Sequence, residues 1–279
     1  MDIRLIAMDL DGTALQRDRC SFSPGLEETL NIAHERGIRV VPVTGRQFGL
    51  LPPALQKNHP WKHLAILCNG GQIRDTRTGQ CLYRTDISAE ALAELLAVAE
   101  EFDLPLEFSV ESKLYLTQRA YEQQLPWPDL AFHRDTILAN HGCVVPSLAA
   151  MCHMPIEKAN LLCISQELRQ PVEQRLKSVA VSAVWSSHTT MEITNPDATK
   201  GNALRQLCRL LEIPMETVMA LGDSGNDITM LQLAGLGVAM GNAPDYVKAA
   251  ADVIAETYDR DGAAKAIRRW ALGFENKVV

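Results

Sequence analysis

The stretch Leu5-Ile6-Ala7-Met8-Asp9-Leu10-Asp11-Gly12-Thr13 decides the fold. Residues 3–8 are mostly apolar and have the composition of a buried strand. Two carboxylates one residue apart follow this strand, and Gly12 then favours a turn. Chemistry collects at the carboxyl ends of strands in α/β sheets, so this is where we expect an active site. Two acids this close repel each other unless one takes a proton or a cation lies between them, which indicates a hard divalent ion.

Two further apolar runs also end in polar residues. They are residues 38–43, which precede Thr44-Gly45-Arg46, and residues 218–221, which precede Gly222-Asp223 and Asn226-Asp227. The helix predicted between the first two strands implies a right-handed parallel crossover, so Thr44 can lie beside Asp9. Lys200 begins another predicted helix shortly before the third of these strand ends.

These motifs occur in the order that is found in the haloacid dehalogenase (HAD) superfamily, which the chain closely resembles. Further phrases resemble the Cof-type subgroup with a type IIB cap: Asn69-Gly70-Gly71, Lys200-Gly201-x-Ala203-Leu204 and Met240-Gly241-Asn242-Ala243. The resemblance covers essentially the whole core and is weakest over residues 120–153. It implies an α/β fold, with a Rossmann-like doubly wound parallel sheet and an inserted α+β cap domain.

The pattern of elements changes near Arg84, where we expect the insertion to begin. Residues 1–84 and 188–279 are predicted to form the catalytic core, and residues 85–187 the cap that determines substrate specificity. Within the insertion, residues 120–153 contain three prolines and show no clean periodicity. Residues 191–194 are expected to lead the chain back to the core.

The resemblance also implies a role for each motif residue in hydrolysis of a phosphate ester through an aspartyl-phosphate. Asp9 would be the nucleophile, Asp11 the general acid and base, and Lys200 the charge that balances the phosphoryl group. The phosphate would contact Gly12, Thr44, Gly45, Arg46 and Asn226. The cofactor would be Mg²⁺, held by the Asp9 carboxylate, the Asp11 backbone carbonyl and Asp223, with Asp227 supporting the metal or Lys200 from behind.

Several of these residues also have plain structural interpretations. Lys200 alone would usually be a solvated helix start, and Asn226 and Asp227 are both common helix caps. Arg46 is either a second phosphate contact or a surface charge. Asn69, at a predicted strand end, either faces the site or makes a turn.

The composition limits the class of protein. The 279 residues carry a net charge of −7 and show no basic patch of the kind that nucleic acid requires. Seven irregularly spaced cysteines do not form a disulfide framework. There is no signal-peptide pattern at residues 1–4 and no apolar run of membrane-spanning length. We therefore expect a cytoplasmic protein, a monomer or small homo-oligomer, without nucleic-acid or membrane partners.

The leading hypothesis is a magnesium-dependent phosphatase (a phosphoric monoester hydrolase) whose partner is a small-molecule phosphate ester. Sugar phosphates and cofactor phosphates are typical substrates of the subgroup that the chain resembles. A mannosyl-3-phosphoglycerate-type phosphatase is a narrower alternative. A phosphomutase on a sugar phosphate would share the aspartyl-phosphate but return the phosphoryl group to the substrate. A non-catalytic binding protein is disfavoured by the intact set of Asp9, Asp11, Lys200 and Asp223.

Overall fold

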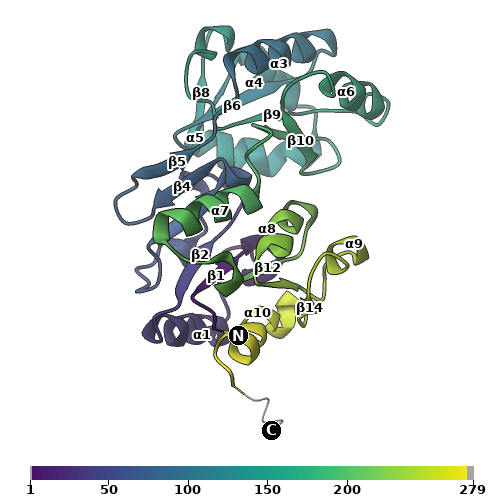
Figure 1. The fold of residues 1–279 in the computed structure, drawn as a ribbon. Coiled ribbons are helices and arrows are strands. Elements are labelled where there is room, and N and C mark those ends of the chain that lie inside the picture. Colours follow the sequence, from purple (N-terminus) through teal and green to yellow (C-terminus); the bar gives the residue numbers. More distant parts are fainter. Residues whose placement is uncertain (1, 275–279) are drawn as a thin grey trace. The chain divides into compact units, whose positions relative to one another are not determined.

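The computed structural model of the chain describes residues 2–274, which divide into two compact units (Figure 1). The first unit contains residues 2–46, 51–83 and 199–274. The second contains Gln47–Leu50 and Arg84–Ala198. Residues 188–198 thus lie in the second unit, whereas the sequence analysis placed them in the core.

The first unit is built on a parallel sheet with the strand order β14-β13-β12-β1-β2. Its strands are β1 (Leu5–Met8), β2 (Arg39–Pro42), β12 (Val218–Gly222), β13 (Leu236–Ala239) and β14 (Val253–Ile254). A smaller sheet adds β3 (Leu64–Leu67), β4 (Gln72–Asp75) and β5 (Cys81–Arg84), and the bridge between Val43 and Ile66 aligns β3 parallel to β2. The helices are α1 (Pro24–Glu35), α2 (Pro53–Gln56), α7 (Lys200–Leu211), α8 (Ile228–Leu233), α9 (Asp245–Lys248) and α10 (Gly262–Ala266).

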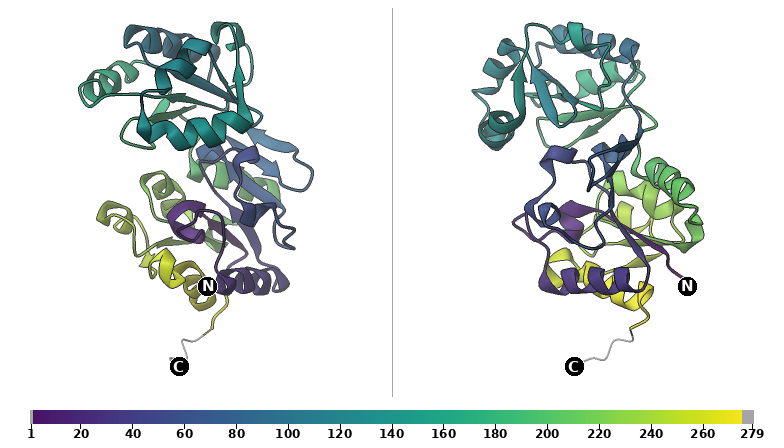
Figure 2. Two further views of the ribbon diagram at one scale, coloured as in Figure 1. Left: turned by 180° about the vertical axis from the view of Figure 1, so that it is seen from behind. Right: turned by 90° about the vertical axis from the view of Figure 1, so that its left-hand side faces the viewer.

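Helices cover both faces of the parallel sheet. On one face, Leu204 of α7 and Leu231 of α8 pack in one buried cluster with Leu5 and Ala7 of β1. Successive strand residues point to opposite faces, so Ile6 and Met8 face the other way. Figure 2 shows α1 and α10 side by side on that other face, and Arg268 Nε donates to Thr29 Oγ1 at 2.7 Å between these segments. This double covering explains why every residue of β1 is buried.

The second unit is a six-stranded sheet with the order β10-β11-β9-β6-β7-β8. Its strands are β6 (Leu106–Val110), β7 (Lys113–Leu116), β8 (Gly142–Val144), β9 (Lys158–Leu161), β10 (Ser182–Trp185) and β11 (Met191–Thr194). Its helices are α3 (Ala89–Glu101), α4 (Gln118–Gln124), α5 (Ala139–His141) and α6 (Arg169–Leu176). Leu95 of α3, Val172 of α6 and Phe108 of β6 share its main apolar cluster.

The other side chains of β6 and β9 form a buried polar network. Glu107 is fully buried, and its carboxylate accepts hydrogen bonds from Gln124 Nε2 at 3.0 Å and Asn160 Nδ2 at 3.4 Å. His133 Nε2 lies 3.0 Å from both oxygens of the same carboxylate. A buried carboxylate is tolerated because these groups replace the water that it loses.

One expectation about a local segment differs from the structure. Residues 191–194 do not lead back to the core but form β11, which pairs antiparallel with both β9 and β10. Residues 47–56 form a 3₁₀ turn over Phe48–Leu50 and then α2, because Pro52 and Pro53 prevent a continuous helix. Residues 120–153 contain short helical turns and β8, which are too short to produce a periodic pattern.

Within residues 2–274, no helix has both the length and the apolar character needed to cross a membrane.

The polar network of the second unit yields a prediction about stability. Glu107→Ala removes the side-chain acceptor that the buried amide groups of Gln124 and Asn160 share, and we expect it to lower the free energy of unfolding by about 2–3 kcal/mol. Glu122→Ala is the matched control, because Glu122 is exposed and accepts one hydrogen bond from Gln118. Urea unfolding followed by circular dichroism measures both, and equal effects would contradict the structural role of the network.

Candidate functional site

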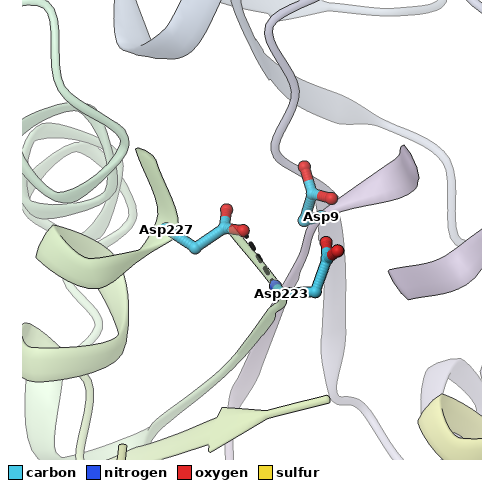
Figure 3. A group of neighbouring side chains, drawn as sticks. All are labelled: Asp9, Asp223 and Asp227. Atoms are coloured by element: carbon cyan, nitrogen blue, oxygen red, sulfur yellow. Dashed lines mark hydrogen bonds between the residues drawn. The ribbon is translucent and has the colours of Figure 1, made fainter. Parts of the chain in front are cut away.

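The site lies at the carboxyl ends of neighbouring parallel strands. Asp9 follows β1 directly, and Asp223 follows β12, which pairs with β1 so that Met8 lies opposite Leu221. Figure 3 shows the carboxylates of Asp9 and Asp223 close together, with Asp227 beside them. Ligand oxygens of these three acids lie within 4.8 Å of one another. The structure therefore brings together three of the four residues that we predicted as metal ligands.

Lys200, the first residue of α7, joins two of these acids. Its Nζ donates to Asp9 Oδ1 at 2.6 Å and to Asp227 Oδ1 at 2.5 Å, and the side chain is 1% exposed. Burial lowers the pKa of Lys200, but the charges of Asp227 and Asp9 raise it by more, so the net shift is upward. Lys200 is thus a buried ammonium ion and not a solvated helix start.

Asp227 orients the other groups of the site. Its Oδ1 accepts from Lys200, and its Oδ2 accepts from the backbone N–H groups of Asp223 and Ser224, both at 2.9 Å. It also completes a capping box with Ser224, so the helix-cap interpretation and the site interpretation hold together. Because both oxygens already accept hydrogen bonds, the geometry favours a supporting role over direct metal ligation.

Asp223 is held by residues from two other segments, the turn after β1 and the chain after β13. Thr13 Oγ1 donates to its Oδ1 at 3.1 Å, and Asn242 Nδ2 donates to its Oδ2 at 3.2 Å. Gly12 lies directly against it with φ +81°, and a Cβ atom there would collide with Asp223 Oδ2. The turn after β1 therefore requires glycine, both for its conformation and for this close approach.

The sequence analysis quoted Thr13 and Asn242 within motifs but assigned neither a role. Asn242 also donates to the backbone carbonyl of Gly12 at 2.9 Å, so it ties the turn after β1 to the metal-site acid. The signal in the sequence that could have indicated a role for Thr13 and Asn242 was the position of each residue inside a motif. Their contacts depend on how distant segments pack, which no local pattern encodes.

The site holds more negative charge than its residues neutralise. Burial raises the pKa of Asp9 well above its usual value, and the charges of Asp227 and Asp223 raise it further against the lowering effect of Lys200. Burial, together with the charge of Asp227, also raises the pKa of Asp223 to about 6. Three carboxylates and one ammonium ion leave two negative charges, which is the charge that a divalent cation balances.

Asp11 and Arg46 form a pair at the rim of the site. Arg46 Nε donates to Asp11 Oδ2 at 2.9 Å, and its Nη2 donates to Asp11 Oδ1 at 2.6 Å. Arg46 is therefore not a free surface charge, and its role as a phosphate contact stays a prediction. The Asp11 side chain is 39% exposed and stands outside the cluster of three acids, which leaves its backbone carbonyl as its expected metal ligand.

Three of the predicted phosphate contacts lie around the same edge of the parallel sheet: Thr44, Gly45 and Asn226. Thr44 is buried, and its Oγ1 accepts from the Arg46 backbone N–H at 3.1 Å. A Cβ atom on Gly45 would lie 2.8 Å from Asn69 Oδ1, so these residues are in close contact. Asn226 Nδ2 donates to the same Asn69 oxygen at 2.9 Å. Asn69 therefore both makes a turn, with φ 56°, and faces the site, as each of its two interpretations predicted.

Comparisons with known proteins agree with this arrangement. A family model described as haloacid dehalogenase-like hydrolase matches residues 6–267. The chain is 30% identical to the 5-amino-6-(5-phospho-D-ribitylamino)uracil phosphatase YcsE of Bacillus subtilis, over 98% of this chain and 97% of that one. It is also 30% identical to the pyridoxal phosphate phosphatase YbhA of Escherichia coli, over 96% and 98%.

Among solved structures, the phosphatase BT1666 of Bacteroides thetaiotaomicron superposes with a TM-score of 0.80. It is 25% identical, and the match covers 96% of this chain and 95% of that one. The predicted α/β fold is thereby confirmed.

The buried ammonium ion yields a prediction about stability. Lys200→Met leaves Asp9 and Asp227 buried without their cation, and we expect a loss of about 3–5 kcal/mol in the free energy of unfolding. Lys265→Met is the matched control, because its ion pair with Glu256 is half exposed, and it should cost less than about 1 kcal/mol. Urea denaturation in a chelator measures both, and similar losses would argue against the central role of Lys200.

Proposed function

Because the chain belongs to the haloacid dehalogenase-like hydrolase family, we propose that it is a magnesium-dependent phosphatase that hydrolyses a small phosphorylated metabolite through a phosphorylated Asp9. The observation that carries this proposal is the buried Lys200 ammonium, which holds Asp9 and Asp227 beside Asp223 at the ends of β1 and β12. A nucleophile, a fixed positive charge and a second metal-site acid thus meet in one place.

Asp9 is positioned to attack phosphorus. Its Oδ1 accepts from Lys200, and within residues 2–274 no hydrogen bond engages its Oδ2. In the first step, Oδ2 forms a bond to phosphorus while the bond between phosphorus and the leaving oxygen breaks. Asp11 donates a proton to that oxygen, then takes one from a water molecule that attacks the phosphorylated Asp9. The products are inorganic phosphate and an alcohol, and Asp9 is restored.

The residues around Asp9 suit a magnesium ion. Its proposed ligands are the Asp9 carboxylate, the Asp11 backbone carbonyl and the Asp223 carboxylate, all oxygen atoms of the kind that Mg²⁺ prefers. When bound, the ion supplies positive charge that offsets the two excess negative charges and polarises the phosphoryl group. Thr13 and Asn242 keep Asp223 in place for this purpose, and Asp227 fixes the backbone on which Asp223 lies.

The phosphoryl oxygens would be bound by groups that lie around the same edge of the parallel sheet. We assign this role to the Thr44 hydroxyl, the backbone N–H groups of Gly12 and Gly45, the Asn226 amide and Lys200. Asn69 positions Asn226 by accepting a hydrogen bond from its amide.

The second unit is proposed to be the cap that selects the leaving group, corresponding to the insertion predicted over residues 85–187. Its exposed charged side chains would recognise the part of the substrate that differs between metabolites. The two bacterial relatives are named for a phosphorylated cofactor and a phosphorylated pyrimidine derivative, so we favour a cofactor phosphate or a related phosphorylated metabolite as substrate.

The central test is phosphate release from a panel of phosphorylated metabolites, with Mg²⁺ or with a chelator. We expect turnover of some panel members that stops when the metal is removed. Asp9→Asn should lower kcat by at least about 10³-fold, because it removes the nucleophile while keeping the shape of the side chain. Turnover by Asp9→Asn equal to that of the parent would exclude the mechanism. An isomeric sugar phosphate as product, without inorganic phosphate, would instead indicate a mutase.

A second test concerns the pair of Asp11 and Arg46. Arg46→Ala removes both hydrogen bonds that orient Asp11, and we expect kcat to fall about 10- to 100-fold with a smaller rise in KM. Arg17→Ala is the matched control, because Arg17 pairs with Asp259 at the surface, and it should leave both constants unchanged. A rise in KM with unchanged kcat would show that Arg46 binds substrate and does not position Asp11.

A further inference from the structure

The edge of the parallel sheet at which the site lies continues past β12. The next two strands, β13 and β14, run parallel to β12, so the chain after each of them reaches the same edge. Asn242 follows β13, and Tyr258 follows β14. The backbone N–H of Gly241 donates to the carbonyl of Glu256 at 3.2 Å, which ties these two segments together. The first segment belongs to a motif quoted in the sequence analysis, whereas the second belongs to none.

Asn242 makes three hydrogen bonds that leave its amide a single orientation. Its Oδ1 accepts from the Tyr258 backbone N–H at 3.1 Å, and that group can only donate. Its Nδ2 donates to the Gly12 carbonyl at 2.9 Å and to Asp223 Oδ2 at 3.2 Å. A carbonyl and an ionised carboxylate can only accept, so the amide cannot be turned over. The side chain is exposed, and these bonds therefore determine its position more than packing does.

The Gly12 carbonyl belongs to the turn that also carries the Asp11 carbonyl. Asp11 has φ −75° and ψ 117°, and Gly12 has φ 81° and ψ 0°, which are the values of the two central residues of a type II turn. A type I turn over the same residues would have ψ of about −30° at Asp11 and would point the Asp11 carbonyl to the other side. Gly12 therefore fixes the direction of this carbonyl. The bond from Asn242 fixes where the turn lies relative to Asp223.

We propose that Asn242, oriented by the Tyr258 backbone, is a positioning residue that sets the affinity of the site for Mg²⁺. This role rests on the proposed function, in which the Asp11 carbonyl and the Asp223 carboxylate are both ligands. It goes beyond the support of Asp223 alone, because one nitrogen atom holds both ligand-bearing segments relative to each other. Ligands that are already in place lose less freedom when an ion binds, which strengthens binding.

The neutral charge of Asn242 suits this role. A lysine or arginine at this position would form an ion pair with Asp223 and would compete with a cation for the carboxylate. An amide donates a hydrogen bond without cancelling that charge. The Asp223 carboxylate is thus held in place and keeps its negative charge for the ion.

Calorimetric titration of Mg²⁺ into the metal-free full chain measures this affinity directly. Asn242→Ala removes both donated hydrogen bonds, and we expect the Kd for Mg²⁺ to rise about tenfold. Asn195→Ala is the matched control and should leave the Kd unchanged. Asn195 likewise donates to a backbone carbonyl, that of Asp86, and accepts from a backbone N–H, that of Asp197.

Kinetics separate this role from a general loss of structure. For Asn242→Ala, the Mg²⁺ concentration that gives half-maximal turnover should rise about tenfold, whereas kcat at saturating Mg²⁺ should fall less than about threefold. The ligands themselves remain in this variant, so excess ion restores the site. A lower kcat at saturating Mg²⁺ with an unchanged Kd would overturn the proposal, because Asn242 would then act on the reaction or the fold and not on the affinity.

A second pair of variants tests the orientation of the amide. Tyr258→Pro removes the backbone N–H that bonds to Asn242 Oδ1, while Tyr258→Ala removes only the side chain. Proline is compatible with this position, because Tyr258 begins a 3₁₀ turn and Thr257 before it is extended, with φ −69° and ψ 154°. We expect the Kd for Mg²⁺ to be about threefold higher in Tyr258→Pro than in Tyr258→Ala.

The binding data distinguish a failure of this role from a failure of the proposed function. If the unmodified chain binds Mg²⁺ and Asn242→Ala binds it equally well, the positioning role is overturned and the proposed function is unaffected. Equal affinities of Tyr258→Pro and Tyr258→Ala would overturn the part assigned to Tyr258. If the unmodified chain does not bind Mg²⁺, the metal site of the proposed function fails and this role fails with it. The two Tyr258 variants decide the question even if Asn242→Ala does not fold.

Discussion

The two short hydrogen bonds from Lys200 to Asp9 and Asp227 hold the site together. They join three segments that are far apart in the chain: the end of β1, the start of α7 and the turn after β12. Burying an ammonium ion is costly unless it is paired, and here each of its two partners is a buried carboxylate. The arrangement is nevertheless two positive charges short of neutrality when Asp9, Asp223 and Asp227 are all ionised. The fold therefore leaves a net negative charge at the site, which a divalent cation would balance.

The parallel sheet determines which residues can take part. Because β12, β1 and β2 are adjacent and run in one direction, the residues that follow them meet at one edge. Gly12 then lets the chain turn back closely enough for its backbone to contact Asp223. The catalytic geometry thus depends on two properties of the chain: the order of strands in the sheet, and a conformation at one position that other residues rarely adopt.

Sequence analysis succeeded where a local motif contains the functional residues. It failed where a residue's role depends on packing between distant segments. Asp9, Lys200 and Asp223 each lie directly at the end of a strand or the start of a helix, so motif and placement could be predicted together. The contacts of Asn242 depend on packing between segments more than 200 residues apart, since it binds the carbonyl of Gly12. Residues 191–194 were assigned to the wrong unit. Their alternation of apolar and polar residues indicates a strand, but it does not determine which strands that strand pairs with. Over residues 120–153, the helices and turns are too short to show the periodic apolar face that sequence analysis relies on.

The pair of Asp11 and Arg46 places a constraint on the proposed mechanism. Both carboxylate oxygens of Asp11 accept hydrogen bonds from Arg46, and a general acid needs one of them for its proton. Each of these oxygens has a second lone pair, so one of them can take a proton while the guanidinium still holds the carboxylate. A substrate phosphate that enters the site brings more negative charge than one carboxylate, and its geometry suits the same guanidinium fork. On the proposed mechanism, the two hydrogen bonds must therefore keep Arg46 on Asp11 against this competition, so that the general acid stays directed at the leaving oxygen.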